Sequence, residues 1–344
     1  MIDDRGDRPA TIGDVAAAAG VAASTVSRAL NNPGRVNART RERIERIAAE
    51  LNYVPSTQAR ALSSGRTRTV ALLVPDITNP FYFDLIRGTQ HQLKASGYTQ
   101  LLVDTEESAD VEAEALDRLR TATDGVILTA SRLSDEQILT TARNRPVVTI
   151  NRNAGTVPTV VIDTPTALRQ AVDHLTALGH RRLAYLGGPV NSFSNGLRWK
   201  ALSEELEQRP ELEIVRLGPF APTTTSGGAA VEAVLNARAT ACIAYNDLIA
   251  IGMLERCRAR GIEVPEQLSI VGCDDIFGAS FCHPPLTTCT APIERVGQVA
   301  TTMLLAQINP AIGHGTTRRH LALVPTHLTI RSSTGPAPVS APQR

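Results

Sequence analysis

Cysteine is scarce in this sequence and confined to its last third. The cysteines are Cys242, Cys257, Cys273, Cys282 and Cys289. Their number is odd and no two have C-x-x-C spacing, which argues against a disulfide scaffold or a structural zinc site and favours a reducing cytoplasm.

The sequence also lacks an apolar run of about 18 residues, and its first ten residues, MIDDRGDRPA, are charged. Neither a membrane span nor a signal peptide is therefore predicted.

The net charge of the 344 residues is only +1, but the charges are unevenly distributed. Nine arginines and three glutamates lie between Val21 and Arg68, which gives this stretch a charge of +6 and leaves −5 for the rest. A basic N-terminal module on an acidic body is the distribution expected of a protein that binds DNA phosphates. The length suggests two or three domains.

The N-terminal residues predict a headpiece of short helices. Thr11 and Asp14 have the spacing of a capping box, and Gly20 supplies the positive φ of the turn that ends the first helix. Ala22 to Asn31 predicts a second helix, with an apolar side formed by Val21, Val26 and Leu30. This is the helix-turn-helix pattern, in which the second helix enters the major groove of DNA.

A third helix, Ala38 to Leu51, is predicted after a turn at residues 31–34, with Asn37 as its N-cap. Its apolar side chains recur at helical spacing and are Ile44, Ile47 and Leu51. Tyr53, Val54 and Pro55 close the headpiece.

From Thr69 onward apolar strands alternate with amphipathic helices, which predicts parallel sheets with right-handed crossovers. The predicted strands are Val70–Val74, Thr99–Val103, Gly125–Leu128, Val147–Ile150, Val160–Ile162, Leu183–Gly187, Ala241–Tyr245 and Ser269–Cys273. The predicted helices include Phe83–Ser96, Val111–Thr121, Thr166–Leu178 and Leu248–Arg260. Ligands of such sheets bind beyond the carboxyl ends of the strands, so the loops there form the candidate site.

Those loops are polar and aromatic. They include Asp76–Phe81, Asn151-Arg152, Asp163-Thr164, Gly187–Arg198, Asn246-Asp247 and Asp274-Asp275. Aromatic residues make up only 3% of the chain, yet all six phenylalanines lie in such loops or just after them: Phe81, Phe83, Phe193, Phe220, Phe277 and Phe281. This clustering predicts a ligand cleft with stacking walls. For Phe83, Phe277 and Phe281 a place in the core is an equal alternative.

The segments TIGDVAAAAGVAASTVSRALNN and TRERIERIAAELNYVPSTQARALSSG resemble the lactose-repressor (LacI/GalR) family, and the similarity continues to about residue 333. The resemblance implies an all-α helix-turn-helix headpiece (1–55), a hinge helix and linker (56–67), and an α/β two-lobed sensor like a periplasmic binding protein, with parallel sheets (68–333). The first lobe would comprise 68–165 and 296–324, and the second 166–295 and 325–333. Residues 334–344 are expected to form a disordered tail without a tetramerising coiled coil.

The resemblance also assigns DNA contacts. Ser24 and Arg28 lie where family members read base edges; the alternative for Arg28 is a solvated helix arginine. In the hinge, Leu62 matches a leucine that wedges into the minor groove, unless the hinge is a plain linker in which Leu62 merely packs. The predicted DNA-binding set is Thr11, Ser24, Thr25, Ser27, Arg28, Asn37, Tyr53, Ala59 and Leu62.

For the sensor, the resemblance implies that Arg198 and Asp274 are the main polar contacts of a bound effector, because arginine offers a rigid donor fork and aspartate accepts from hydroxyls. The predicted effector-binding set is Asn79, Phe81, Asn151, Phe193, Arg198, Phe220, Asn246 and Asp274. Asp247 and Asp275 can equally be structural. A polyol such as a sugar or a nucleoside is the expected effector.

Other functions fit the sequence less well. Asp274, Asp275 and His283 could be catalytic, but adjacent carboxylates rarely converge on one bond, and no phosphate loop, G-x-S-x-G or H-E-x-x-H motif is present. No enzyme activity, cofactor or metal is therefore expected. A secreted binding protein is excluded by the headpiece and the missing signal peptide. A regulator that senses thiol oxidation or a metal through Cys273, Cys282 and Cys289 remains an alternative, although their spacing matches no standard site.

The sequence therefore predicts a cytoplasmic, nucleoid-associated transcriptional regulator, expected to be a repressor and without a membrane partner. It would bind a pseudo-palindromic operator as a homodimer. A small sugar-like effector would change the closure of the two lobes and, through the hinge, the affinity for operator DNA.

Overall fold

The computed structural model describes residues 8–31, 33–54, 65–309 and 320–338. The chain divides into two units, Met1–Thr67 and Arg68–Arg344. The hinge residues Ala59 and Leu62 lie outside the described residues, so their roles stay predictions. No helix in the described ranges is long and apolar enough to cross a membrane.

The described part of the first unit contains α1 (Ile12–Ala19), α2 (Ala23–Asn31), a short 3-10 helix η1 (Pro33–Arg35) and α3 (Ala38–Glu50). The predicted capping box is present: the Thr11 hydroxyl accepts from the Asp14 N–H at 3.4 Å, and the Asp14 carboxylate accepts from the Thr11 N–H at 2.8 Å. Asn37 caps α3 by accepting from the Arg39 N–H at 3.0 Å. Both helix starts thus follow from local sequence.

The core of the headpiece takes one fully buried side chain from each helix: Val15, Val26 and Ile44. The prediction that Leu51 continues the apolar side of α3 is wrong, because α3 ends at Glu50 and the Leu51 side chain is 37% exposed. Tyr53 packs against the core in its place.

The second unit has two lobes. Lobe 1 contains the strands β1 (Thr69–Val74), β2 (Thr99–Asp104), β3 (Gly125–Thr129), β4 (Val147–Ile150), β5 (Thr159–Ile162) and β11 (Leu321–Val324), and the helices α5 (Phe81–Ala95), α6 (Ala109–Arg118), α7 (Asp135–Asn144) and α12 (Ile293–Ile308). Lobe 2 contains the strands β6 (Arg182–Leu186), β7 (Glu213–Leu217), β8 (Ala241–Ala244), β9 (Ser269–Cys273), β10 (Thr287–Thr290) and β12 (His327–Thr329), the helices α8 (Thr164–Ala177), α9 (Phe193–Gln208), α10 (Gly227–Asn236) and α11 (Asp247–Arg260), and the 3-10 helices η2 (Thr224–Ser226) and η3 (Phe277–Ser280).

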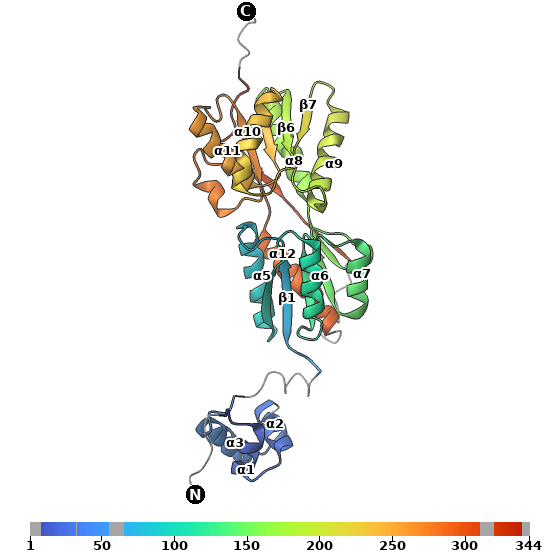
Figure 1. The fold of residues 1–344 in the computed structure, drawn as a ribbon, viewed down its shortest axis with the longest axis vertical. Helices are drawn as coiled ribbons and strands as arrows, with labels where there is room; N and C mark the ends of the chain where they lie inside the picture. The colour runs from blue at the N-terminus through green and yellow to red at the C-terminus, as the bar shows by residue number, and fades with distance from the viewer. Residues whose placement is uncertain (1–7, 32, 55–64, 310–319, 339–344) are drawn as a thin grey trace, which may run out of the picture. The chain divides into compact units, whose positions relative to one another are not determined.

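Each lobe is built on one six-stranded sheet with helices on both faces (Figure 1). The strand order is β11-β5-β4-β3-β1-β2 in lobe 1 and β12-β10-β9-β8-β6-β7 in lobe 2. The predicted parallel sheets are confirmed, with one exception: the edge strand β12 is antiparallel to β10. Every predicted strand agrees with the observed one to within one residue at each end.

The chain passes between the lobes three times, from β5 to α8, from β10 to α12 and from β11 to β12. The first and third crossings are bonded to each other: the Asp163 N–H donates to the Val324 carbonyl at 2.9 Å, and the Thr326 hydroxyl donates to the Asp163 carbonyl at 2.6 Å. The second crossing leads into α12, which packs closely on α5. A Cβ at Gly88 would lie only 2.0 Å from the Glu294 carbonyl oxygen, so this contact requires glycine.

Residues 333–337 pack against lobe 2, which corrects the expectation that disorder begins at residue 334. Ser333 is fully buried. The Gly335 carbonyl lies 3.1 Å from Nε2 of the buried His180, and the Ala337 N–H donates to the Leu178 carbonyl at 2.8 Å. Composition did not indicate this packing, because hydrogen bonds of the backbone and of the Ser333 and Thr334 hydroxyls, and not large apolar side chains, hold the segment.

Candidate functional site

The helix α2 presents an exposed polar face. Ser24 and Arg28 are exposed one turn apart, and Arg28 Nη2 donates to Ser24 Oγ at 3.4 Å. Thr25 and Ser27 are half-buried. The opposite side of α2 is fixed in the core through Val26. Ser24 and Arg28 are therefore held on a rigid helix with their polar atoms open to a partner, as base-edge contacts require.

Three other residues of the predicted DNA-binding set have structural roles. Thr11 and Asn37 are N-caps, and Tyr53 packs on the headpiece core. The two caps fix the starts of α1 and α3. That Thr11, Asn37 and Tyr53 also contact DNA stays a prediction.

A cavity of about 20 Å³ lies between the lobes. Its lining comprises Phe81, Asn151, Ile162, Thr164, Arg198, Cys273, Asp274, Cys289, Thr290, Ala291, Ile293 and Thr326. Both lobes and all three crossings contribute to this lining. The space is enough for about one water molecule. A larger molecule can bind there only if the lobes or their side chains move apart.

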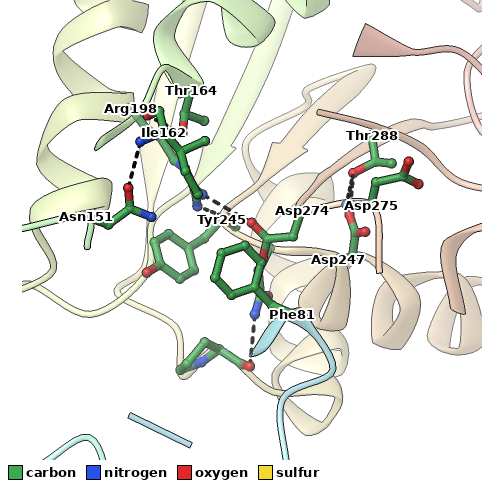
Figure 2. Close-up of polar contacts among 12 residues, drawn as sticks. Phe81, Asn151, Ile162, Thr164, Arg198, Tyr245, Asp247, Asp274, Asp275 and Thr288 are labelled. Atoms are coloured by element: carbon green, nitrogen blue, oxygen red, sulfur yellow. Dashed lines mark hydrogen bonds and ion pairs between the residues drawn. The ribbon is translucent and has the colours of Figure 1, made fainter. Parts of the chain in front are cut away.

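Arg198 and Asp274 form an ion pair at the cavity (Figure 2), with 3.4 Å between Nη2 and Oδ1. Their side chains are only 7% and 12% exposed. Arg198 also donates to the Tyr245 carbonyl, and its Cζ lies 4.7 Å from the centre of the Tyr245 ring. Burial raises the pKa of the Asp274 carboxyl well above its usual range, and the charge of Arg198 only partly opposes this.

The Nε atom of Arg198 is a buried donor without a hydrogen-bond partner among the described residues. Leaving such a group unsatisfied is costly, especially when it is charged. Arg198 is therefore fixed on two sides by Tyr245 and Asp274 and keeps one donor for a further acceptor.

Lobe 1 contributes Asn151 and Phe81 to the cavity. Asn151 follows β4 with a φ of 51°, and its Oδ1 accepts from the Ile162 N–H at 3.0 Å (Figure 2). This leaves the Asn151 amide nitrogen as a donor. Phe81 begins α5 and is held edge-to-face against Tyr82, with ring centres 5.0 Å apart. Of the predicted effector-binding set, the structure thus brings together Phe81, Asn151, Arg198 and Asp274.

Asn79, Phe193, Phe220 and Asn246 do not line this cavity. Asn79 accepts from the Phe81 N–H at 3.0 Å. Asn246 caps α11 through the Ile249 N–H, also at 3.0 Å, and its amide nitrogen donates to the Pro222 carbonyl. Both asparagine side chains therefore fix the starts of helices beside the cavity, and a contact of these four residues with a ligand stays a prediction.

Sequence reasoning missed Tyr245, whose ring lies beneath Arg198. Tyr245 directly follows β8, so the rule that points to loops after strands could have found it. Its ring lies flat against Gly188, where a Cβ would be 2.5 Å from the ring. Thr164 lies in one of the predicted loops after strands, but Thr290 and Thr326 had no local signal, because their meeting depends on how the chain passes between the lobes.

Phe83, Phe277 and Phe281 are not core residues and do not line the cavity, so the core interpretation is wrong and a place in the wall of a wider cleft stays a prediction. Their side chains are 44%, 62% and 70% exposed. The ring centres are 6.4 Å apart for Phe83 and Phe277 and 5.6 Å apart for Phe277 and Phe281. Phe83 belongs to α5 of lobe 1 and the other two to lobe 2, so these residues, here called the aromatic ladder, connect the two lobes on their outer surface.

Of the three cysteines of the alternative sensor, Cys273 and Cys289 are neighbours on β9 and β10, whereas Cys282 packs against a different apolar cluster. All five are free, and four of them are buried. The hydrogen bond with Cys289 and burial raise the pKa of Cys273 well above its usual range, and burial raises the pKa of Cys282, which keeps these two thiols protonated. In the described ranges no group of three His, Cys, Asp or Glu residues could hold a metal ion. The alternative of a thiol or metal sensor therefore has no support.

A second carboxyl, Asp247, lies fully buried behind the turn that carries Asp274. It accepts from the Thr288 hydroxyl at 2.6 Å (Figure 2) and from the Ile276 N–H at 2.9 Å. Burial raises the pKa of Asp247 to about 7. The folded protein therefore holds a proton that the unfolded chain releases above about pH 4.

We expect Asp247→Asn to change how stability depends on pH. The free energy of unfolding of the wild type should fall as pH rises from about 4 to about 7, because in this range the folded state binds more protons at Asp247 than the unfolded state does. The variant should lack the part of this fall that Asp247 contributes, which should amount to at least about 1.4 kcal/mol, the equivalent of one pKa unit. Urea titrations at several pH values test this, with Glu211→Gln, an exposed carboxyl of the same lobe, as control. Parallel pH profiles for Asp247→Asn and wild type would contradict the prediction.

Comparison with known proteins gives matches over most of the chain. The family described as bacterial regulatory proteins, lacI family, matches residues 11–56, and the periplasmic binding protein-like domain matches residues 172–334. The HTH-type transcriptional repressor CytR of Escherichia coli (strain K12) is 34% identical over 339 residues, covering 96% of this chain and 97% of that protein. The ribose operon repressor of Bacillus subtilis (strain 168) is 34% identical over 301 residues, covering 87% and 92%. A crystal structure of the lac repressor dimer bound to operator and the anti-inducer ONPF matches with a TM-score of 0.83 and 26% identity, covering 95% of this chain and all of that one.

Proposed function

The chain belongs to the lacI family of bacterial regulatory proteins, and we propose that it is a repressor whose affinity for its operator is set by a sugar-like effector bound between the lobes. It is a helix-turn-helix transcriptional regulator and not an enzyme. The observation that supports effector control is the lining of the cavity: a ligand there would touch both lobes and all three crossings. Such a ligand would bind the open and closed arrangements with different affinity, as a population shift requires.

In this proposal the headpiece reads DNA through α2. Ser24 and Arg28 would contact base edges in the major groove, and two headpieces of a homodimer would bind the halves of a pseudo-palindromic operator. Leu62 would enter the minor groove, with Ala59 beside it. The protein would act in the cytoplasm, at the nucleoid.

The groups at the cavity favour a neutral ring that carries hydroxyls. Arg198 and Asn151 offer donors, Asp274 accepts from hydroxyls, and Phe81 offers an apolar face to a ring. The ribose operon repressor of Bacillus subtilis is 34% identical to this chain, so D-ribose is the first probe to use and nucleosides follow. Because the cavity holds only about 20 Å³, binding must widen it, and this movement is the proposed signal to the hinge.

Selection of bound DNA from a random library, with and without a panel of sugars and nucleosides, tests this function. We expect a recovered palindrome and at least one compound that changes its recovery. Binding without any palindromic preference would contradict the proposed dimer on a two-part operator.

The aromatic ladder gives a prediction for the dimer. Exposed rings of this size in one patch favour burial against a partner, here a second copy of the chain. We expect Phe277→Ser to weaken dimerisation at least about 100-fold, because burying a phenylalanine contributes about 1.5–3 kcal/mol and a symmetric interface would bury two copies. Sedimentation velocity over a range of concentrations measures this.

Val190→Ser is the matched control, since Val190 is 80% exposed in the same lobe but is not part of the aromatic ladder. It should leave dimerisation unchanged. A Phe277→Ser protein that dimerises like the wild type would place the interface elsewhere.

A further inference from the structure

The turn that carries Asp274 has a strained backbone. Asp274 and Asp275 have φ values of 119° and 52°, so two consecutive residues with side chains lie in the region that favours glycine. Such conformations persist only where the surroundings hold them. The position of the Asp274 carboxylate, 3.4 Å from Arg198, therefore depends on the contacts that hold this turn.

One set of contacts lies on the inner side of the turn. The Asp274 N–H donates to the Cys289 carbonyl of β10 at 2.9 Å. Asp247, the first residue of α11, accepts from the Ile276 N–H at 2.9 Å. The Asp275 N–H also donates to the Thr288 hydroxyl, at 3.4 Å. These bonds attach the backbone of the turn to neighbouring elements but do not touch the Asp275 side chain.

The Asp275 side chain is held on the other side, directed away from Asp274 (Figure 2). Its Oδ1 accepts from Arg331 Nη2 at 2.7 Å, and its Oδ2 accepts from the Thr290 hydroxyl at 3.0 Å. The side chains of Arg331 and Asp275 are only 20% and 19% exposed. This ion pair is shielded more than a typical surface pair and so contributes more.

Arg331 is itself fixed in place. Its Nη1 donates to the Leu286 carbonyl at 2.7 Å, and its backbone N–H donates to the Thr287 hydroxyl at 3.0 Å. It lies two residues after β12, the strand that follows the third crossing between the lobes. One side chain thus connects the segment after a crossing to the turn that carries Asp274.

We propose that Arg331 is a positioning residue of the effector site, which holds the strained turn through Asp275 and so keeps Asp274 in place against Arg198. The inference rests on the proposed effector cavity. Arg331 touches no residue of the cavity lining through its guanidinium, so its effect on a ligand would pass through the turn. Arg331 follows the third crossing. A movement of the lobes would therefore shift Arg331 and, through Asp275, also Asp274.

Variants of the full chain test the proposal: Arg331→Met, Asp275→Asn, the double variant and Arg331→Lys. The matched control is Arg209→Met, which breaks ion pairs with the exposed Asp173 and the buried Glu205 elsewhere in lobe 2. Ligand affinity is measured with D-ribose and nucleosides through the emission of Trp199, the only tryptophan of the chain, which directly follows Arg198.

We expect Arg331→Met and Asp275→Asn each to weaken the affinity for the compound that binds the wild type by about 10-fold or more. This is the effect expected when hydrogen bonds to a charged group are lost. The double variant should lose no more than either single one, because both remove the same contact. Arg331→Lys should recover part of the affinity, and Arg209→Met should leave it unchanged. Wild-type affinity in Arg331→Met, or additive losses in the double variant, would overturn the proposal.

Amide hydrogen exchange gives a readout that needs no ligand. In Arg331→Met the amides of residues 274–276 should exchange about 10-fold faster or more, while Arg209→Met should not change them. Unchanged exchange there would overturn the positioning role. If no compound of the panel binds the wild type, the proposed effector class fails, and the exchange rates still decide for or against the role of Arg331.

Discussion

Replacing Arg198 by methionine is expected to remove control by the effector. The affinity for the effector should fall about 10- to 150-fold, since a hydrogen bond to a charged group contributes about 1.5–3 kcal/mol and Arg198 has an unpaired Nε at the cavity. Affinity for operator DNA without effector should be retained. Calorimetric titration and DNA binding by fluorescence anisotropy measure the two quantities.

The same change is expected to destabilise lobe 2. Without Arg198, Asp274 stays buried without its cation, and breaking a buried pair costs about 3–5 kcal/mol. Adding Asp274→Asn to Arg198→Met should restore much of this stability but none of the effector affinity, which separates the two effects.

Arg182→Met serves as control, because Arg182 forms an exposed ion pair with Glu213 in the same lobe. It should change stability by less than about 1 kcal/mol. Effector affinity in Arg198→Met within a few-fold of the wild type would show that the ligand binds elsewhere.

Replacing Arg28 by alanine is expected to abolish specific recognition of the operator. A bidentate contact of arginine with guanine contributes about 1–3 kcal/mol, and a dimer loses two of them, so operator affinity should fall about 30- to 10⁴-fold. Affinity for unrelated DNA should fall much less, with a smaller dependence on salt. Anisotropy titrations with both DNAs at several salt concentrations measure this.

Arg28→Lys keeps the charge but loses the fork, and it should resemble alanine on the operator and the wild type on unrelated DNA. Arg46→Ala, which removes an arginine that pairs with Glu50 on α3, is the matched control and should bind both DNAs normally. An equal loss on both DNAs in Arg28→Ala would mean that Arg28 contacts phosphates and not bases.

Much of the local structure could be predicted from the sequence. The strands and the helix starts at Thr11 and Asn37 follow from short-range rules, in which side-chain spacing and capping groups act within a few residues. Leu51 shows the limit of these short-range rules. Its spacing fits the apolar side of α3, but the helix ends before it and the core takes Tyr53 instead.

The candidate site was predicted in part. Asp274, Asn151 and Phe81 follow or lie near strand ends, where the topology of parallel sheets collects them. Arg198 lies within α9, and it and the ligand role of Asp274 were assigned through the family resemblance. Of the residues at the crossings, Thr164 lies in a predicted loop, but Thr290 and Thr326 could not be predicted, because no pattern near them indicates that the three crossing segments meet. The position of the aromatic ladder could not be predicted either, because aromatic side chains suit a cleft, a core and an interface equally well.

The sequence by itself determined the helix-turn-helix, the family and the position of the polar loops, since these depend on order along the chain. Only the tertiary structure decided which of the predicted residues share a cavity, that residues 333–337 pack on lobe 2, and that Arg331 holds the turn of Asp274. The physical reason is distance along the chain: Arg198 and Asp274 are 76 residues apart, and Arg331 and Asp275 are 56 apart. Such contacts depend on the strand order and on three crossings, which no local preference specifies.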